Sequence, residues 1–239
     1  MMFGFDPLYI LILVVTMAVS GLVSFMVKSR FKAGQEVRIA SGLTGQQVAA
    51  ALIREAGLAD VQIVEHDGFL SDHYNPLTKT LALSHDVYHG KNASAAGVAA
   101  HEAGHAIQHA ENYFPMWVRS AIVPVANIGS SIGPLLVIVG IVLGAASGWG
   151  HMIAVLGVYL FGAATVFTVV TVPVEFDASS RAKDQLIRLR ITQPGEEQDA
   201  VASVLTAAGL TYVAAAVSSI AMLLYWAMRA GLLGGKSDD

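Results

Sequence analysis

Residues 94–113 read SAAGVAAHEAGHAIQHAENY, a run that contains two histidines separated by three residues. Ser94 is a suitable N-cap and alanines follow it, so we expect a helix that extends to Glu111. In such a helix His101 and His105 lie one turn apart on the same face. Two imidazoles in this arrangement can both reach one zinc ion at distances of about 2.0–2.1 Å. The stretch therefore predicts a helix that carries two zinc ligands.

Glu102 completes the pattern His-Glu-x-x-His. On the helix it is angled toward the open position of the metal, where a carboxylate can take a proton from water and return it during hydrolysis. The competing interpretation is a helix whose histidines are surface or packing residues. We favour the zinc interpretation, with Glu102 as the catalytic residue and one Zn²⁺ per chain.

The composition is typical of a membrane protein, because 54% of the residues are hydrophobic and only 13% are charged. A net charge of −4 argues against nucleic acid as a partner. The chain has no cysteine, which excludes a disulfide framework and a thiolate metal site. Any metal ion must therefore be held by His, Asp or Glu.

Four apolar runs have the length of about 20 residues that a bilayer core requires. The first, 7–27, is followed at once by basic residues, as expected of a retained anchor and not of a cleaved signal peptide. The second and third form a membrane hairpin over 121–174, and the fourth covers 204–228. We expect the remaining residues, 229–239, to be a flexible tail.

Residues 35–113 read as a small soluble domain between the first span and the hairpin. Within it we expect a helix from Thr44 to Ala56, short strands at 61–64 and 79–84, and then the helix with the two histidines. A second polar segment, with its own helix, follows the hairpin.

Of the 14 Lys and Arg residues, 12 lie in these two polar segments or directly beside them. By the positive-inside rule both segments face the cytoplasm and both termini lie on the other side.

A catalytic zinc normally takes three protein ligands. The hairpin returns the chain to the side it left, so Glu175 lies on the same side as His101 and His105, at the start of the polar helix 175–200. A carboxylate at that depth is costly unless it has a partner, and a divalent cation is a good one. The alternative is a glutamate in water that the helix dipole stabilises. We predict Glu175 as the third ligand.

Other candidate ligands fit less well. His109 lies about 12 Å along the helix axis from His101, so it cannot share the same ion. We expect it on the surface or in contact with a ligand, without binding the metal itself. Asp177 is close enough to Glu175 to support a ligating histidine. His85 and His89 also stand four residues apart, with Asp86 and no glutamate between them, and we interpret them as structural or as minor substrate contacts.

The runs AAHEAGHAIQHA, DHYNP, TLALS, VYHG and VEFDASSRA together resemble the YugP-type neutral zinc metallopeptidases of bacterial membranes. The resemblance extends from the first span into the polar segment after the hairpin. It implies a zinc endopeptidase of the bacterial cell (inner) membrane, with a compact zincin-like catalytic domain at 35–113 on the cytoplasmic side. It also suggests His101, His105 and Glu175 as ligands and Glu102 as the catalytic acid/base.

A more distant likeness is to the HtpX and CAAX-processing membrane proteases, which pair the same motif with a glutamate after a membrane hairpin. In that group an aspartate commonly stands four residues beyond the ligand glutamate and supports the site. Here that position is Ser179, and the nearest acid is Asp177. We expect both residues to lie around the zinc, outside its ligands.

The resemblance to zincins also suggests that TLALS is the edge strand along which an extended peptide substrate lies, although an ordinary sheet strand fits the pattern equally well. The predicted substrate-binding residues are Leu81, Ala82, Leu83 and His73. For the oxyanion of the transition state, His73, Tyr74 and Tyr88 are candidates. Arg181 fits either an orientation toward the site or one along the surface.

The sequence thus predicts an α-helical membrane protein with about four transmembrane helices and a small α+β catalytic domain. The expected activity is hydrolysis of peptide bonds at the cytoplasmic membrane face. A non-proteolytic metal-binding scaffold or assembly factor is the alternative, and a transporter is less well supported because the hairpin holds few ionisable groups. The expected partners are a peptide or membrane-protein substrate and the lipid bilayer, with a membrane-protein adaptor or a homo-oligomer left open.

Overall fold

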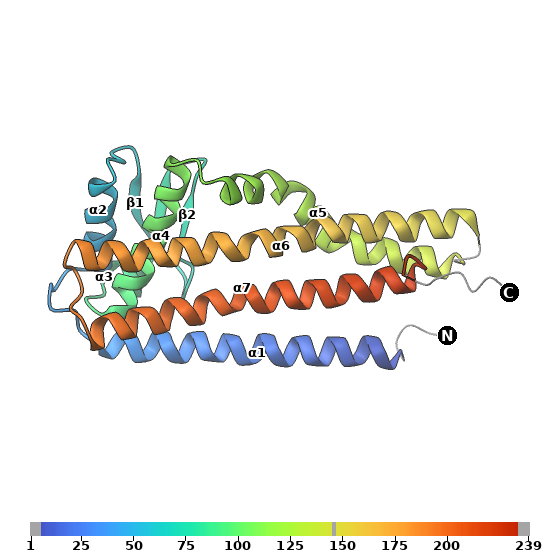
Figure 1. The fold of residues 1–239 in the computed structure, drawn as a ribbon, viewed down its shortest axis with the longest axis horizontal. Helices are drawn as coiled ribbons and strands as arrows, with labels where there is room; N and C mark the ends of the chain where they lie inside the picture. The colour runs from blue at the N-terminus through green and yellow to red at the C-terminus, as the bar shows by residue number, and fades with distance from the viewer. Residues whose placement is uncertain (1–5, 145–146, 234–239) are drawn as a thin grey trace. The chain divides into compact units, whose positions relative to one another are not determined.

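The computed structural model describes residues 6–144 and 147–233, so the last part of the predicted tail lies outside the described residues. The elements labelled in Figure 1 are, in chain order, α1 (Pro7–Glu36), α2 (Gly45–Glu55), β1 (Gln62–His66), β2 (His73–Asn75), β3 (Thr80–Ser84), α3 (His85–His89), α4 (Ala93–Ala110), α5 (Phe114–Val142), α6 (Gly148–Arg188) and α7 (Glu196–Arg229). They form two compact units.

The first unit, here called the apolar unit, consists of Met1–Gly21, Val118–Val172 and Tyr212–Asp239. Among the described residues, four helices, α1, α5, α6 and α7, are long and apolar enough to cross a membrane. Together with the small sheet of the other unit, they confirm the predicted fold class of about four membrane helices and a small α+β domain.

Small residues and aromatic rings hold the apolar unit together. A Cβ atom added to Gly129 of α5 would lie 2.0 Å from the carbonyl oxygen of Leu160 in α6, so the two helices approach to backbone contact there. The ring centroids of Tyr9 in α1 and Trp226 in α7 lie 5.8 Å apart. Such close packing of small residues is typical of membrane helices, which have no hydrophobic effect to drive their association.

The helix α6 contains 41 residues without interruption, although Pro173 lies inside it. At about 1.5 Å per residue it is roughly 60 Å long, twice the thickness of a bilayer core. The predicted separate polar helix at 175–200 is therefore wrong. Glu175 to Arg188 continue α6, and α7 begins at Glu196.

The second unit, here called the mixed unit, consists of Leu22–Trp117 and Pro173–Thr211. Its three-stranded sheet has the order β1-β3-β2, with β1 parallel and β2 antiparallel to β3. Of the two interpretations of TLALS, the edge strand is wrong and the ordinary sheet strand is confirmed: β3 is the central strand, hydrogen-bonded on both sides, and Leu81, Ala82 and Leu83 are buried. The edges of the sheet are β1 and β2.

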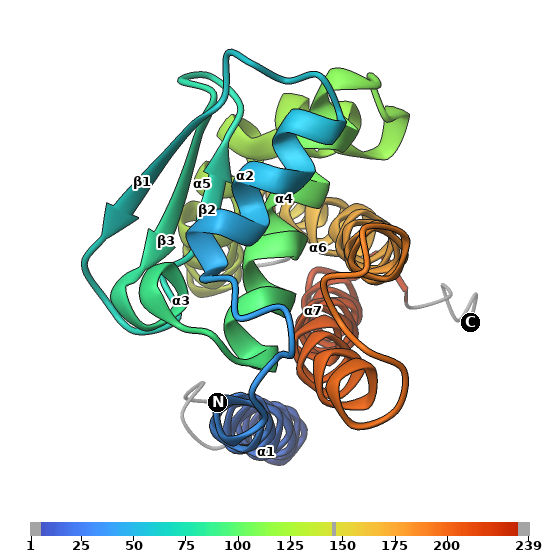
Figure 2. The same cartoon turned by 90° about the vertical axis from the view of Figure 1, so that its left-hand side faces the viewer.

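The helices α2 and α4 lie side by side against the sheet (Figure 2). The predicted start of α2 is confirmed, because the Thr44 side chain accepts a hydrogen bond from the Gln47 backbone N–H and the Gln47 side chain accepts one from the Thr44 backbone N–H. The predicted N-cap of α4 is wrong by two residues: Asn92 caps the helix, and the buried Ser94 hydroxyl donates instead to the carbonyl of Phe31 in α1.

Alanine and glycine make most of the buried surface of α4, which lets other backbones come close to it. Gly104 lies inside the His-Glu-x-x-His motif. A Cβ atom at this position would lie 2.7 Å from the carbonyl oxygen of Ala178 in α6. This contact brings the polar half of α6 against the face of α4 that carries the two histidines.

Candidate metal centre

His101 and His105 of α4 and Glu175 of α6 converge on one point; we call these three residues the buried triad. The Oε2 atom of Glu175 lies 3.2 Å from Nε2 of His101 and 3.5 Å from Nε2 of His105. Ligands of a tetrahedral zinc ion at about 2.0–2.1 Å are separated from one another by roughly 3.4 Å. These two separations are therefore close to those that a zinc ion requires, and three donors leave one coordination position for water or substrate.

A side chain that the sequence analysis missed, Gln108, orients His105. Gln108 is fully buried and its Nε2 donates to the carbonyl of Val174 (2.9 Å) and to Asp177 (2.7 Å). Its Oε1 must therefore face Nδ1 of His105, 2.9 Å away, and can only accept the Nδ1 proton. This fixes the tautomer in which Nε2 of His105 presents its lone pair to the metal position.

Ser179 has the corresponding position beside His101. Its hydroxyl lies 3.1 Å from Nδ1 of the imidazole, and Ser179 itself is buried. The hydroxyl can accept the Nδ1 proton, which again leaves Nε2 free for a metal. Asp177 supports His105 only indirectly, through Gln108. Both residues that we expected around the ligands thus lie within one or two hydrogen bonds of the buried triad.

The charges around the buried triad favour a cation. Burial lowers the pKa of His105, but its hydrogen bond with Glu175 and the charge of Glu102 outweigh this effect and raise the pKa above its usual value. Glu102 lies on α4 next to His101 and is itself buried. Two carboxyl groups beside two imidazoles create a negative potential that a divalent ion can neutralise.

An ionic network joins α6 to the end of α4 beside the site. Arg181 donates to Asp177 and to Glu111, each at 2.6 Å, and its guanidinium lies 5.7 Å from the centre of the Tyr113 ring. The side chain of Arg181 is therefore held by the carboxylate that orients Gln108. This ion pair in turn restrains the carboxylate of Asp177.

The other predicted site residues have contacts of their own. His73 is exposed on the edge strand β2, where its ring contacts His66 and its Nδ1 lies 2.9 Å from the carbonyl oxygen of Ser71. Tyr74 makes a hydrogen bond to Nδ1 of His109 (3.0 Å), so β2 is linked to α4 beyond the motif. The ring of Tyr88 packs on His89. None of these contacts includes a residue of the buried triad.

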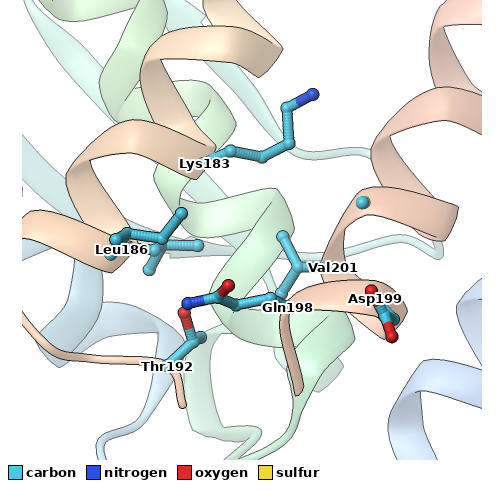
Figure 3. A pocket seen from close by; sticks show the side chains of 8 residues that line it. Lys183, Leu186, Thr192, Gln198, Asp199 and Val201 are labelled. Carbon is cyan, nitrogen blue, oxygen red and sulfur yellow. The ribbon is translucent and has the colours of Figure 1, made fainter. Parts of the chain in front are cut away.

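A hollow lies between the end of α6 and the start of α7, within the mixed unit (Figure 3). Apolar side chains such as Leu186 and Val201 line it together with Thr192 and Gln198, and Lys183 extends away from them. Its lining contains no histidine and none of the predicted site residues. The hollow is therefore not part of the metal centre.

Comparisons with known proteins agree with this geometry. Residues 9–231 match the sequence profile of a family described as "Putative neutral zinc metallopeptidase". The chain is 41% identical over 232 residues to the "Putative membrane protease YugP" of Bacillus subtilis (strain 168), an alignment that covers 97% of this chain and all of the relative. No solved structure matches the chain. The chain thus belongs to the family described as "Putative neutral zinc metallopeptidase".

Proposed function

We propose that the protein is a zinc-dependent endopeptidase of a bacterial cell membrane that hydrolyses peptide bonds at the cytoplasmic face. The observation that carries the proposal is the spacing of the buried triad, in which the separations of 3.2 and 3.5 Å between the carboxylate oxygen and the two imidazole nitrogens suit one tetrahedral ion. The family relationship and the four apolar helices support it.

His101, His105 and Glu175 would hold the ion, and Gln108 and Ser179 would fix the two imidazoles. When bound, zinc supplies Lewis acidity, which polarises a substrate carbonyl group and makes water a stronger acid. The carboxylate of Glu102 takes a proton from the attacking water and then delivers it to the nitrogen of the leaving amine.

An extended peptide can approach this site along β2. This strand pairs with β3 on one side, and within the described residues no other strand pairs with it. The hydrogen bond between Tyr74 and His109 links β2 to the motif helix. We infer that β2, and not β3, supplies the backbone donors and acceptors for a peptide or an unfolded loop of a membrane protein.

The substitution Glu102→Gln tests the catalytic role directly. It removes the proton acceptor without removing a proposed ligand, so the protein should keep its zinc while hydrolysis of a fluorogenic peptide falls by about 10²–10⁴-fold. The exposed Glu55 of α2 offers a matched control, and Glu55→Gln should retain wild-type activity. A Glu102→Gln protein that cleaves peptides at the wild-type rate would refute the mechanism, and full complementation of a deletion strain by it would support the scaffold alternative.

The orientation can be tested in cells because the chain has no cysteine of its own. Leu77, in the turn before β3, is 94% exposed. A membrane-impermeant maleimide should label Ser147→Cys in intact cells but should label Leu77→Cys only after the membrane is permeabilised. The reverse pattern would place the mixed unit outside the cell.

A further inference from the structure

A second cluster of two histidines and one glutamate lies on the surface of the mixed unit. It consists of Glu65 of β1 with His85 and His89 of α3, and we call it the exposed triad. One potential ligand atom from each residue lies within 4.8 Å of the other two. The spacing of the two histidines is visible in the sequence, but the acid comes from a strand twenty residues earlier.

The parallel pairing of β1 with β3 brings these residues together. Glu65 lies opposite Leu83, one residue before β3 ends, and α3 begins at His85 directly after the strand. His85 and His89 are one helical turn apart, and Val87 between them is fully buried, so the histidines lie toward solvent. The backbone of the cluster is thus held by the sheet and the core, while its side chains remain accessible to ions.

The distances suit a metal ion. Nε2 of His89 lies 3.3 Å from one carboxylate oxygen of Glu65, close to the roughly 3.4 Å between ligands of a tetrahedral ion. Nδ1 of His85 lies 2.6 Å from the other oxygen and must move outward by less than 1 Å. This costs little, because the side chain of His85 is 74% exposed.

The charge state also suits a cation. The hydrogen bond with His85, followed by that with His89, holds the pKa of Glu65 below its usual value, so its carboxylate is ionised at neutral pH. A neutral imidazole can offer a lone pair to a metal. Two imidazoles and a carboxylate are a donor set that zinc, copper and nickel accept.

We propose that the exposed triad is a second binding site for a divalent transition-metal ion, which would connect β1 to α3. This site is independent of the buried triad. Ligands that lack supporting partners usually bind metal 10–100-fold more weakly, so we expect the second ion to bind at least about tenfold more weakly than the first. The alternative occupant is a proton, which would make the cluster an ordinary pair of His–Glu ion pairs.

The test is the zinc stoichiometry of the purified full chain, stripped of metal and titrated with Zn²⁺ against a chromophoric chelator. Wild type should bind two ions in two resolved steps, and Glu65→Gln should lose only the weaker step. His66→Gln is the matched control, because His66 is the next residue of β1 and its ring contacts His73 instead. It should still bind two ions. A wild type that binds only one ion, or a Glu65→Gln protein that keeps both, would overturn the proposal.

A second measurement separates the two sites. Glu175→Gln should lose the tighter step and keep the weaker one. In that background, electron paramagnetic resonance of added Cu²⁺ should show nitrogen coupling that His89→Gln reduces to one imidazole. Nitrogen coupling that is unchanged by His89→Gln would place the copper elsewhere and contradict the proposal.

Discussion

The buried triad and the exposed triad use the same three side-chain types but differ in their surroundings. In the buried triad the side chains are 14%, 9% and 2% exposed for His101, His105 and Glu175. In the exposed triad all three side chains are more than 40% exposed. Gln108 and Ser179 hold the Nδ1 atoms of the buried histidines. The His85 Nδ1, by contrast, is the atom that contacts the carboxylate itself.

Ligand identity alone therefore does not make a catalytic site. A buried set of ligands with fixed tautomers binds an ion without rearrangement, and water is excluded from all but the open position. In both pairs an acid directly follows the first histidine, but Glu102 of the buried triad is buried, whereas Asp86 beside the exposed triad is exposed to solvent. We therefore expect chemistry at the buried triad and simple ion binding at the exposed one.

Removal of a ligand should produce the largest contrast. His105→Asn should weaken the tighter zinc step by more than about a hundredfold, because losing a ligand must cost more than losing its supporting partner. His89→Asn should leave that step unchanged. Metal content after dialysis, measured by plasma mass spectrometry, distinguishes the two variants. Equal zinc content in both proteins would remove the distinction between the two triads.

Removal of a supporting partner should have the next largest effect. Gln108→Leu deletes the acceptor for the His105 Nδ1 proton and should lower zinc affinity by about 10–100-fold. Ser179→Ala should act in the same direction on His101, whereas Ser179→Asp supplies a stronger acceptor and should keep the affinity at wild-type level or above it. Competition with a chelator of known affinity measures all three. An unchanged affinity in Gln108→Leu would show that His105 needs no orientation.

A change of backbone packing should have a smaller effect. The added methyl group of Gly104→Ala would collide with the Ala178 carbonyl, so α6 and its Glu175 must move away from α4. We expect the free energy of unfolding to fall by about 1–3 kcal/mol and zinc affinity to fall severalfold. Gly21→Ala in α1 is the control, since no atom lies within 4 Å of the added Cβ there. If the two variants had the same thermal unfolding temperature and zinc affinity, the metal centre would not depend on the close approach of α4 and α6.

The parts of this molecule that local patterns specify were predictable from the sequence. The four apolar helices follow from hydrophobic length, and the start of α2 at Thr44 follows from a short-range capping signal. The approach of Glu175 to the motif followed from the topology of the hairpin. Its role as a ligand stays a prediction.

The rest depends on contacts between segments far apart in the chain. Gln108 looked like one more polar residue of a helix, although its position three residues after His105 placed it on the same face. Asn92, and not Ser94, caps α4, because the Ser94 hydroxyl donates its hydrogen bond to a carbonyl of α1 instead. The central position of β3 depends on β2, a three-residue strand that has no pattern of its own. Glu65 joins the exposed triad only through the pairing of β1 with β3.

The most direct test of the buried triad as a zinc site compares the zinc affinity of Glu175→Gln with that of wild type and of Glu65→Gln, under identical conditions. Glu175 is the ligand that comes from α6, about seventy residues from the motif helix, so the buried triad exists only if this residue binds the ion. We expect Glu175→Gln to lose the tighter zinc ion and Glu65→Gln to retain it. A Glu175→Gln protein that binds zinc as tightly as wild type would show that Glu175 is not a zinc ligand.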